Sequence, residues 1–525
     1  MSVNFINAKA AAELIQDRAT VAIDGFIGFC LADDILGEIE DRFVREGHPR
    51  DLSVVNIAGL GGDGKNRGIN HFAHKGLMRR FLCSNLSLAP KLYPLIMDNA
   101  FPTFMMPQGV LSHMMRAIAS HRPGIISQVG MKTFVDPRVD GGRINEAAKE
   151  SQETIVELTK LRGEEYLFYP AFPLDVALIK GSKADMKGNV SIEKEAIHIE
   201  QFEMAAAAKN SGGIVMVQVD EVVEHGALHP QMVTVPSSLV DYVIVGSPEN
   251  TGQHFIGDSR PVPSWCGDEK VSLDRMETMP LNIQKAICRR SIFELSAGDF
   301  INLGIGIPMH VSDVLNEEGL IDKICSSIES GVTGGAPAAG LATGAAYNPE
   351  AILKQPDIFD FYDGGGIDFA ALGAAEIDRR GNVNVSRFAG KVTGPGGFIN
   401  ITQGAKTVCF LGTFTAGKSD IRIEDGKLRV LEDGTKIKFK EQVGHITFSG
   451  DYSVSKGTQK VFYITERAVF QLTRAGLTLI EIAPGVDLEQ DVLAKMEFRP
   501  VISLDLKEMD PRIFRPERMA LILSK

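Results

Sequence analysis

The sequence predicts an α/β protein made of two related domains, each built on a largely parallel sheet. Three observations support this fold class. Short apolar runs alternate with helical patterns, the chain has 525 residues, and a segment of its first half recurs in its second half. Because one hydrophobic core stops growing at roughly 250 to 300 residues, a chain of this length is expected to form more than one core.

The apolar runs of the first half have the length of buried strands. They read LSVVNIAGL at 52–60, PGIISQVG at 123–130 and GGIVMVQVD at 212–220, while CLADDILGEIEDRFVREG at 30–47 has a helical pattern. Alternation of this kind predicts parallel strands joined by helices. The second half continues the same alternation.

An internal repeat relates the two halves. VALIKGSKADMKGNVSI from Val176 aligns with FAALGAAEIDRRGNVNV from Phe369 at an offset of 193 residues, which pairs Asp185 with Asp378. The same offset lays the apolar run at 214–219 over TVCFLG at 407–412. Each half also opens with a strand and a glycine turn, and the first half carries an insertion of about 86 residues between that turn and the repeat.

These features predict an N-terminal domain over 1–256 with the large insertion, a linker over 257–282, and a C-terminal domain over 283–525. The linker is rich in proline and charge and has no sustained apolar period. In doubly wound sheets, ligands bind at the carboxyl ends of strands, so we expect the functional residues there. Near the C-terminus, two Asp-Gly dipeptides within 421–439 predict hairpins.

Composition excludes several classes of protein. A formal net charge of -12 argues against binding to nucleic acid, and no apolar run is long enough to suggest a membrane span. The first residues have the pattern of a capped helix and not of a signal peptide, so a cytoplasmic location is expected. The cysteines form no C-x-x-C pair, so neither a disulfide framework nor a zinc site is indicated.

A single carboxylate, Glu329, stands among small residues in SSIESGVTGGAPAAG at 326–340. A lone Glu after a strand is commonly solvated or caps a helix, yet nothing basic precedes this one, and a sheltered site would raise its pKa. A functional carboxylate there could act as a general base or as a nucleophile that forms an acyl intermediate. The residues themselves do not decide between these roles.

The glycine turn NLGIGIP at 302–308 follows an apolar strand and opens a helix. It could be a structural turn, a dinucleotide-binding turn with Glu329 as the ribose ligand, or a loop that cradles another ligand. Met309 stands where the third glycine of a dinucleotide motif belongs, and the chain after Glu329 runs through further glycines. We therefore favour the ligand-cradling loop.

Other candidate groups give weaker patterns. His71 and His74 have a spacing that a metal could use, but no third ligand is evident, so surface histidines and no metal site are expected. Ser112 and His113 are adjacent, and adjacent side chains point apart on a helix or a strand. A Ser/His/Asp triad is therefore not predicted.

Taken together, several motifs resemble the family I coenzyme A transferases, in the branch of the acetate and propionate CoA-transferases. They are NLGIGIP, SSIESGVTGG, FDFYDGGGIDFAALGAAEIDRRGNVNVSRF, GPGGFINIT and EIAPGVD in the second half, and MPQGVLSHMMRAIASHRPGIISQVGMKTFVDPR, EYLFYPAFPLDVALIKGSKADMKGN and NSGGIVMVQV in the first. The resemblance covers nearly the whole chain. It implies two related three-layer α/β domains of the CoA-transferase type.

The resemblance also implies a chemistry. Glu329 would attack an acyl-CoA to give an acyl-glutamyl anhydride, then a glutamyl-CoA thioester, and the steps would reverse with a second carboxylate in ping-pong order. Gly396 and Gly397 would approach the reacting centre and offer an amide, with Gln108 as a polar neighbour. The CoA would be lined by Gly304, Ile305, Gly306, Ile307 and Pro308.

The implied reaction needs no metal and no permanently bound cofactor, since CoA is both substrate and covalent intermediate. The expected partners are short-chain acyl-CoA (acetyl, propionyl or butyryl) and carboxylic acids such as acetate, in a homodimer or homotetramer. Two alternatives are an acyl-CoA hydrolase and a non-catalytic sensor of acyl-CoA or sugar phosphate. Ser330 after the carboxylate departs from many relatives and leaves the acyl preference open.

Overall fold

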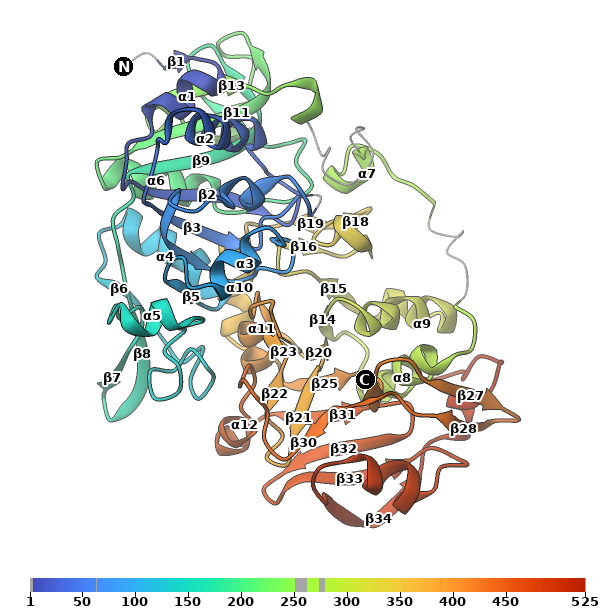
Figure 1. The fold of residues 1–525 in the computed structure, drawn as a ribbon. Coiled ribbons are helices and arrows are strands. Elements are labelled where there is room, and N and C mark those ends of the chain that lie inside the picture. Colours follow the sequence, from blue (N-terminus) through green and yellow to red (C-terminus); the bar gives the residue numbers. More distant parts are fainter. Residues whose placement is uncertain (1–2, 63, 251–261, 273–278, 389, 525) are drawn as a thin grey trace. The chain divides into compact units, whose positions relative to one another are not determined.

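The computed structural model describes residues 3–62, 64–250, 262–272, 279–388 and 390–524 (Figure 1). Contacts divide the chain into two compact units. The first unit comprises Met1–Val271, Glu329–Asp360 and Val392–Gly397, and the second comprises Ser272–Ile328, Phe361–Lys391 and Phe398–Lys525. Within the predicted linker at 257–282, residues 257–261 and 273–278 lie outside the described residues, and the division at that linker remains a prediction.

The first unit is built on a parallel sheet, as predicted. Its strand order is β1-β13-β11-β9-β2-β3-β4-β5, and each neighbouring pair is parallel. The strands span Asn4–Phe5 (β1), Tyr242–Val245 (β13), Ile214–Val223 (β11), Val176–Asp185 (β9), Thr20–Phe26 (β2), Leu52–Ala58 (β3), Met78–Cys83 (β4) and Thr103–Met105 (β5). Strand β3 is buried at every position, which is why its sequence reads as an unbroken apolar run.

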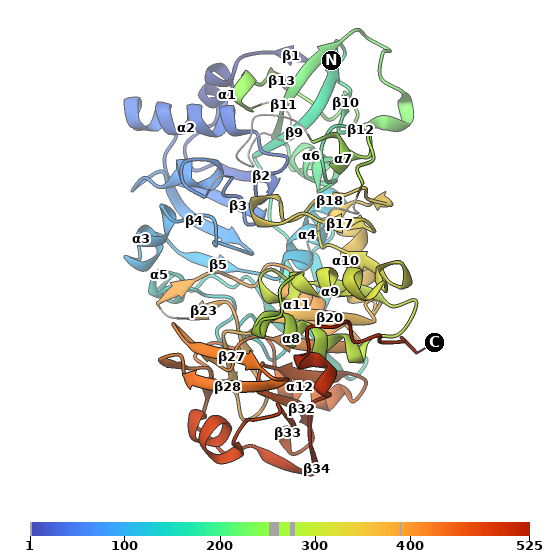
Figure 2. The ribbon, with the colours of Figure 1, turned by 90° about the vertical axis from the view of Figure 1, so that its right-hand side faces the viewer.

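Helices cover this sheet on both faces. Helices α1 (Ala8–Leu14) and α2 (Asp33–Glu46) lie on one side, and α4 (Gln108–Ala119) and α6 (Gln201–Asn210) pack together on the other (Figure 2). Shorter elements of the unit are α3 (Leu92–Met97), α5 (Glu146–Glu150), α7 (Pro263–Cys266), β10 (Val190–Ser191), β12 (Val233–Val235), β16 (Val332–Thr333), β17 (Ala336–Pro337), β18 (Ala346–Tyr347) and β19 (Ala351–Ile352). The result is the predicted three-layer arrangement.

One predicted strand of the first half belongs to a different sheet. The run at 123–130 forms β6 (Gly124–Ser127), which pairs antiparallel with β8 (Glu164–Pro170), and β8 pairs antiparallel with β7 (Glu157–Leu161). The side chain of Ile126 is 49% exposed, so this strand lacks the two-sided burial of the parallel sheet. An apolar run alone did not distinguish the two environments.

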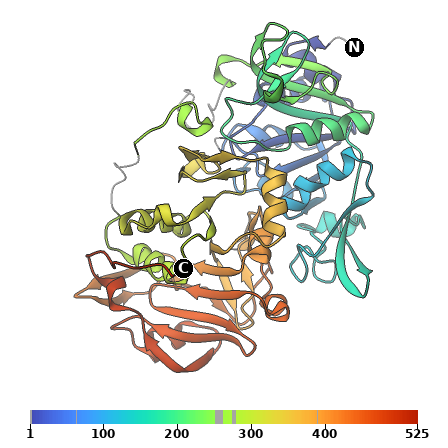
Figure 3. The same ribbon diagram turned by 180° about the vertical axis from the view of Figure 1, so that it is seen from behind.

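The second unit repeats the plan of the first. Its strand order is β15-β14-β20-β25-β31-β32-β33-β34 (Figures 1 and 3). Neighbours are parallel from β15 to β31, antiparallel from β31 through β32 to β33, and parallel again between β33 and β34. The strands span Cys325–Ser327 (β15), Phe300–Leu303 (β14), Phe369–Gly373 (β20), Thr407–Leu411 (β25), Lys460–Ile464 (β31), Ala468–Thr473 (β32), Gly476–Ile482 (β33) and Val501–Glu508 (β34). Helices α8 (Ile283–Ser291) and α9 (Val311–Glu318) pack together in a core with β14, β20 and β25.

The remaining elements are short. They are α10 (Gln355–Asp363), α11 (Phe398–Gly404), α12 (Gly450–Lys456), β21 (Glu376–Asp378), β22 (Val383–Asn384), β23 (Arg387–Phe388), β24 (Lys391–Val392), β26 (Thr415–Ala416), β27 (Asp420–Glu424), β28 (Lys427–Glu432), β29 (Lys436–Ile437) and β30 (Phe439–Lys440). No helix among the described residues is long and apolar enough to cross a membrane.

The internal repeat has a structural basis. Strands β9 and β11 are parallel neighbours in the first unit, and their repeat partners β20 and β25 are parallel neighbours in the second. In the first copy Asp185 Oδ1 accepts from the backbone N–H of Lys187 and Asn189, at 3.0 and 2.9 Å. Asp378 accepts from Arg380 and Asn382 in the same way, both at 3.0 Å. The repeated letters therefore encode one turn, built twice.

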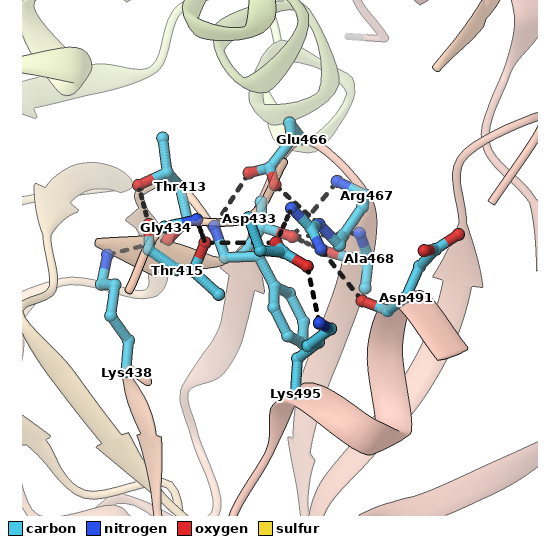
Figure 4. A network of polar contacts seen from close by, with 12 residues as sticks. Thr413, Thr415, Asp433, Gly434, Lys438, Glu466, Arg467, Ala468, Asp491 and Lys495 are labelled. Atoms are coloured by element: carbon cyan, nitrogen blue, oxygen red, sulfur yellow. Dashed lines mark hydrogen bonds and ion pairs between the residues drawn. The ribbon is translucent and has the colours of Figure 1, made fainter. Parts of the chain in front are cut away.

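Only the first of the two C-terminal Asp-Gly dipeptides makes a hairpin. Asp425 and Gly426 both have positive φ and connect β27 to β28, as predicted. After the second dipeptide, β29 pairs with β26 and not with β28, so that hairpin prediction is wrong. Asp433 instead forms ion pairs with Arg467 (2.8 Å) and Lys495 (3.2 Å), which fix the turn to a distant part of the unit (Figure 4).

Candidate active site

Glu329 follows strand β15 by two residues and is held by a tight turn. The next residue but one, Gly331, has φ of 100°, and a Cβ there would lie 2.0 Å from the carbonyl oxygen of Leu353. Only glycine fits so close an approach. The glycine after the carboxylate therefore clamps the Glu329 segment against the β19 segment of the same unit.

Glu329 lies in a largely enclosed place. Part of the residue remains accessible, while the surrounding protein removes most of the water from the carboxylate. This loss of hydration raises the pKa of Glu329 from 4.5 to about 7. A carboxylate in such a place is poorly stabilised and correspondingly reactive towards an electrophile.

Gly397 and Gly396 lie against this carboxyl group. A Cβ on Gly397 would be 3.1 Å from Cδ of Glu329, so the absence of a side chain lets the backbone reach the carboxylate. The N–H of Gly396 donates to the carbonyl oxygen of Ser84 at 2.9 Å. Of the two predicted amide donors, Gly396 is thus occupied by a protein acceptor, and Gly397 is the better candidate for a substrate oxygen.

Gln108 joins the same group of residues. It begins helix α4, is 2% exposed, and donates its backbone N–H to the carbonyl oxygen of Gly396 at 3.0 Å. A Cβ built on Gly396 would lie 3.6 Å from both Gln108 Oε1 and Asn85 Nδ2. The structure therefore brings together Glu329, Gly396, Gly397 and Gln108, which the sequence places far apart, and adds Asn85, which sequence reasoning missed.

Further missed residues lie behind Gln108. In the orientation that satisfies both ends of its amide, Gln355 accepts from Gln108 Nε2 at 2.9 Å and donates to Glu200 at 2.9 and 3.1 Å. The hydroxyl of Ser112 also donates to Glu200. No motif marks Gln355 or Glu200 in the sequence. Ser112 was considered only as a possible nucleophile beside His113. The ring of His113 lies instead 3.0 Å from the carbonyl oxygen of Pro356.

Ser330 is turned away from any incoming acid. Its side chain is fully buried, and its hydroxyl donates to the carbonyl oxygen of Gly344 at 2.5 Å. Gly344 in turn lies against the ring of Phe26. The residue that departs from many relatives thus serves the packing of the Glu329 segment.

The predicted CoA-binding residues belong to the second unit. Gly304 directly follows β14 and donates its N–H to the carbonyl oxygen of Ala371 at 2.8 Å, and Gly306 has φ of 88°. A 3₁₀ turn over Ile307–His310 separates the glycines from helix α9, and the side chain of Ile305 is 68% exposed. A dinucleotide motif leads directly from its glycines into a helix, so this geometry does not favour the dinucleotide alternative.

The second unit also contains a cavity of about 690 Å³ at the carboxyl end of β20. Lys436, Lys438 and Lys440 alternate along one of its walls, and Phe388 contributes an aromatic ring. Lys438 is buried and donates to the carbonyl oxygen of Thr413 at 3.0 Å (Figure 4). Burial lowers the pKa of Lys438 from 10.5 to about 8, and the negative charge of Glu466 offsets only part of this effect.

The two histidines that the sequence singled out lie beside an acid. The part of the chain that the structure describes contains no group of three or more His, Cys, Asp or Glu side chains able to hold a metal ion. His71 and His74 are half-buried, contrary to the expected surface position, and both contact the carboxylate of Glu40, at 2.5 and 2.6 Å. Burial opposes both shifts, but Asp33 and then Glu40 raise the pKa of His71, and the two histidines lower the pKa of Glu40.

Comparison with known proteins agrees with this geometry. Residues 6–246 match the family model for coenzyme A transferase. The chain is 42% identical to caffeate CoA-transferase of Acetobacterium woodii (97% of each chain) and 41% identical to acetate CoA-transferase YdiF of Escherichia coli K12 (100% of this chain, 97% of that protein). The crystal structure of the E. coli O157:H7 acyl-CoA transferase YdiF as a thioester complex with CoA matches with a TM-score of 0.93 at 40% identity, over 100% of this chain and 98% of that one. The chain therefore belongs to the coenzyme A transferase family.

Proposed function

We propose that this enzyme transfers CoA between a short-chain acyl-CoA and a carboxylate, such as acetate, with Glu329 as the covalent nucleophile. The observation that carries the proposal is the placement of the Glu329 carboxyl group. Burial removes water from this group, the residue as a whole stays partly accessible, and a Cβ on Gly397 would lie 3.1 Å from its carboxyl carbon. The names of the relatives, and the thioester complex of the E. coli protein, support this assignment.

The proposed cycle proceeds in ping-pong order. An oxygen of Glu329 attacks the acyl carbonyl, the C–S bond breaks, and CoA leaves as a thiolate, so that an acyl-glutamyl anhydride is formed. The thiolate then attacks the glutamyl carbonyl and expels the first carboxylate, which leaves a glutamyl-CoA thioester. A second carboxylate reverses these steps. No proton and no electron is gained or lost overall, and the energy of the thioester is conserved.

Each attack creates an oxyanion that needs hydrogen-bond donors. We assign these donors to the N–H of Gly397 and the side-chain amide of Gln108, because both residues adjoin Glu329 or the glycine beside it. A single preorganised donor of this kind typically contributes about 3 to 4 kcal/mol to transition-state stabilisation. The low polarity around Glu329 strengthens such bonds and limits hydrolysis of the intermediates.

The cavity of the second unit suits the phosphates of CoA. We infer that Lys436 and Lys438, on one wall of the cavity, bind a phosphate group, while Phe388 and the alanines of the wall contact less polar parts. We keep Gly304 to Pro308 as a second CoA-binding segment of the same unit. Lys438→Met should raise the KM for acyl-CoA at least tenfold without changing the KM for acetate, and equal KM values for the variant and the wild type would contradict this role.

The proposed preference for short acyl chains is supported by the similarity to an acetate CoA-transferase and not by an acyl-binding pocket. Of the small residues after the nucleophile, Ala338 is buried but Ala339 is exposed, so the three alanines 336, 338 and 339 do not form one closed wall. A homodimer or homotetramer and a cytoplasmic location remain part of the proposal. Neither affects the chemistry at Glu329.

Trapping experiments separate this function from its alternatives. The enzyme is incubated with propionyl-CoA without acceptor, treated with borohydride or hydroxylamine, and mapped by mass spectrometry, with the Glu329→Gln variant as control. We expect modification of Glu329 alone. Wild-type activity in the variant would refute the nucleophile, release of free CoA at the same rate without acceptor would indicate a hydrolase, and binding without turnover would indicate a sensor.

A further inference from the structure

Gly396 is held between two segments of the first unit that each carry a side-chain amide. Its N–H donates to the carbonyl oxygen of Ser84 at 2.9 Å, and its carbonyl oxygen accepts from the N–H of Gln108 at 3.0 Å. Asn85 directly follows Ser84 and lies two residues beyond the end of β4. These backbone bonds fix where the side chains of Asn85 and Gln108 begin relative to Gly396.

The side-chain amide of Asn85 has a defined orientation. Its Oδ1 accepts from both the backbone N–H and the hydroxyl of Ser87, at 2.8 and 2.6 Å. A backbone N–H can only donate, so the NH₂ group of Asn85 cannot take the place of Oδ1. The NH₂ group therefore faces away from Ser87, and Nδ2 lies 3.6 Å from the position that a Cβ on Gly396 would occupy. Within the described residues, Nδ2 makes no hydrogen bond of its own.

The space over Gly396 is flanked by one donor and one acceptor. Apart from adjoining backbone, the described atoms within 4 Å of a Cβ built on Gly396 are Nδ2 of Asn85 and Oε1 of Gln108, both at 3.6 Å. A secondary amide of a ligand has the complementary pair, because its carbonyl oxygen accepts and its N–H donates. A carboxylate has acceptors only and leaves Oε1 of Gln108 without a donor. The space therefore suits a neutral amide better than an acid.

CoA carries such an amide close to its sulfur. In the pantetheine arm, two methylene groups separate the sulfur from the nearer amide, so the amide nitrogen is four bonds from the carbonyl carbon of a thioester. Four bonds of an extended chain span roughly 5 Å, and neighbouring Cα atoms are about 3.8 Å apart. Gly397, the next residue after Gly396, lies so close to Glu329 that a Cβ there would be 3.1 Å from its carboxyl carbon. A sulfur attached to Glu329 would thus bring the amide within reach of the space over Gly396.

We propose that Asn85 and Gln108 bind the pantetheine amide nearest the sulfur of CoA. Nδ2 of Asn85 donates to the carbonyl oxygen of that amide, and Oε1 of Gln108 accepts from its N–H. This inference rests on the proposed function, because the amide is placed from a thioester at Glu329. The contact uses the carbonyl end of the Gln108 side chain and leaves its NH₂ end for the role assigned above. It makes Asn85 a substrate-binding residue and gives a reason for glycine at 396, where a side chain would fill the space.

The test uses three propionyl thioesters in place of propionyl-CoA, with acetate as the acceptor. The thioester of N-acetylcysteamine retains the amide, that of 2-acetoxyethanethiol replaces the N–H by an ester oxygen, and that of 1-pentanethiol lacks both polar groups. The value of kcat/KM is measured from the acetyl thioester formed. Each neutral hydrogen bond should change kcat/KM by about 3-fold to 10-fold, so the wild type should prefer amide over ester and ester over alkyl.

Two variants of Asn85 assign the donor. Asn85→Ala should make the ester and alkyl thioesters equal within about twofold, because the carbonyl oxygen loses its partner, while the amide stays better than the ester. Asn85→Asp preserves the shape and the acceptor facing Ser87 but replaces Nδ2 by an oxygen, so the ester should become slower than the alkyl thioester. Ratios taken within one variant cancel any general loss of activity.

Two further variants serve as a steric test and a control. Gly396→Ala places a methyl group 3.6 Å from both amides, so it should lower kcat/KM for the N-acetylcysteamine thioester at least about tenfold. Its melting temperature should fall by only a few degrees. Asn210→Ala, at the exposed end of α6, is the matched substitution and should leave all ratios within about twofold of the wild type.

The outcomes separate the two proposals. Wild-type ester-to-alkyl ratios in both Asn85 variants, or a wild type that does not distinguish the three thioesters, would overturn the subsite. If the small thioesters react too slowly to measure, propionyl-CoA decides: Asn85→Asp should lower its kcat/KM at least about tenfold, and an unchanged value would overturn the subsite. Failure of the proposed function would appear separately, as full activity of Glu329→Gln.

Discussion

Replacement of Glu329 by Gln should remove activity and at the same time stabilise the protein. The native state binds a proton at Glu329 more tightly than the unfolded chain does, so stability falls as pH rises from about 4.5 to about 7. A tenfold change in proton affinity corresponds to about 1.4 kcal/mol, so a pKa raised from 4.5 to about 7 destabilises the native state by up to about 3 kcal/mol above pH 7. Glutamine occupies nearly the same volume and cannot ionise.

The assay is urea unfolding of wild type and variant at two pH values. The variant should exceed the wild type by up to about 3 kcal/mol at pH 8.5 and by less than about 1 kcal/mol at pH 5, where the wild-type carboxyl is mostly protonated when folded. Glu203→Gln, on α6, is the matched substitution at another buried acid. CoA transfer from propionyl-CoA to acetate is measured in parallel.

Two results would refute the reasoning. A variant no more stable than the wild type at pH 8.5 would show that the protein around Glu329 does not disfavour the ionised form. A stabilisation of equal size at pH 5 and pH 8.5 would trace the gain to packing and not to charge.

Three other predictions concern the same site and the repeated turn. The kcat/KM for acyl-CoA should rise about tenfold per pH unit up to a pKa near 7 and then level off, because the proposed attack requires an ionised Glu329. A kcat/KM that does not change from pH 5 to pH 8 would be inconsistent with this role. Gly397→Ala should lower kcat at least about 100-fold with little change in melting temperature, since its Cβ would lie 3.1 Å from the Glu329 carboxyl carbon; near-normal turnover would exclude so close a contact. Gly381→Ala should reduce the free energy of unfolding, measured in urea, by about 1 to 3 kcal/mol. The φ of Gly381 is 75°, and a Cβ there would lie 2.5 Å from the hydroxyl oxygen of Tyr463. An unchanged unfolding midpoint would show that the turn relaxes to accept the methyl group.

Much of the fold could be predicted from the sequence because its signals are local. The parallel strands of both units are apolar runs, and the repeat of Asp185 and Asp378 marks a turn whose hydrogen bonds span only four residues. Predictions failed where the local structure depends on contacts with residues far away in the sequence. Asp433 binds Arg467 and Lys495 from other segments, and this outweighs the tendency of an Asp-Gly pair to form a hairpin.

Some residues of the candidate site could be predicted from sequence motifs, and others could not. Glu329, Gly396 and Gly397 lie in glycine-rich motifs, and Gln108 lies in a motif of the first half, so all four could be proposed before the fold was known. Glu200 and Gln355 have no such marker. Gln355 and Glu200 are 155 positions apart in the sequence, at the start of α10 and just before α6, and only the fold brings them together.

The twin turns of the two units point to a duplicated scaffold that is chemically asymmetric. Strand β15 of the second copy leads into Ile328 and Glu329, whereas strand β3 of the first leads into Gly59 and Leu60, which have no group able to carry an acyl chain. In the proposed mechanism the duplicated framework therefore carries one nucleophile. Covalent labelling with acyl-CoA should accordingly saturate at one equivalent per polypeptide, and the first copy is free to supply donors and supports to the chemistry instead of repeating it.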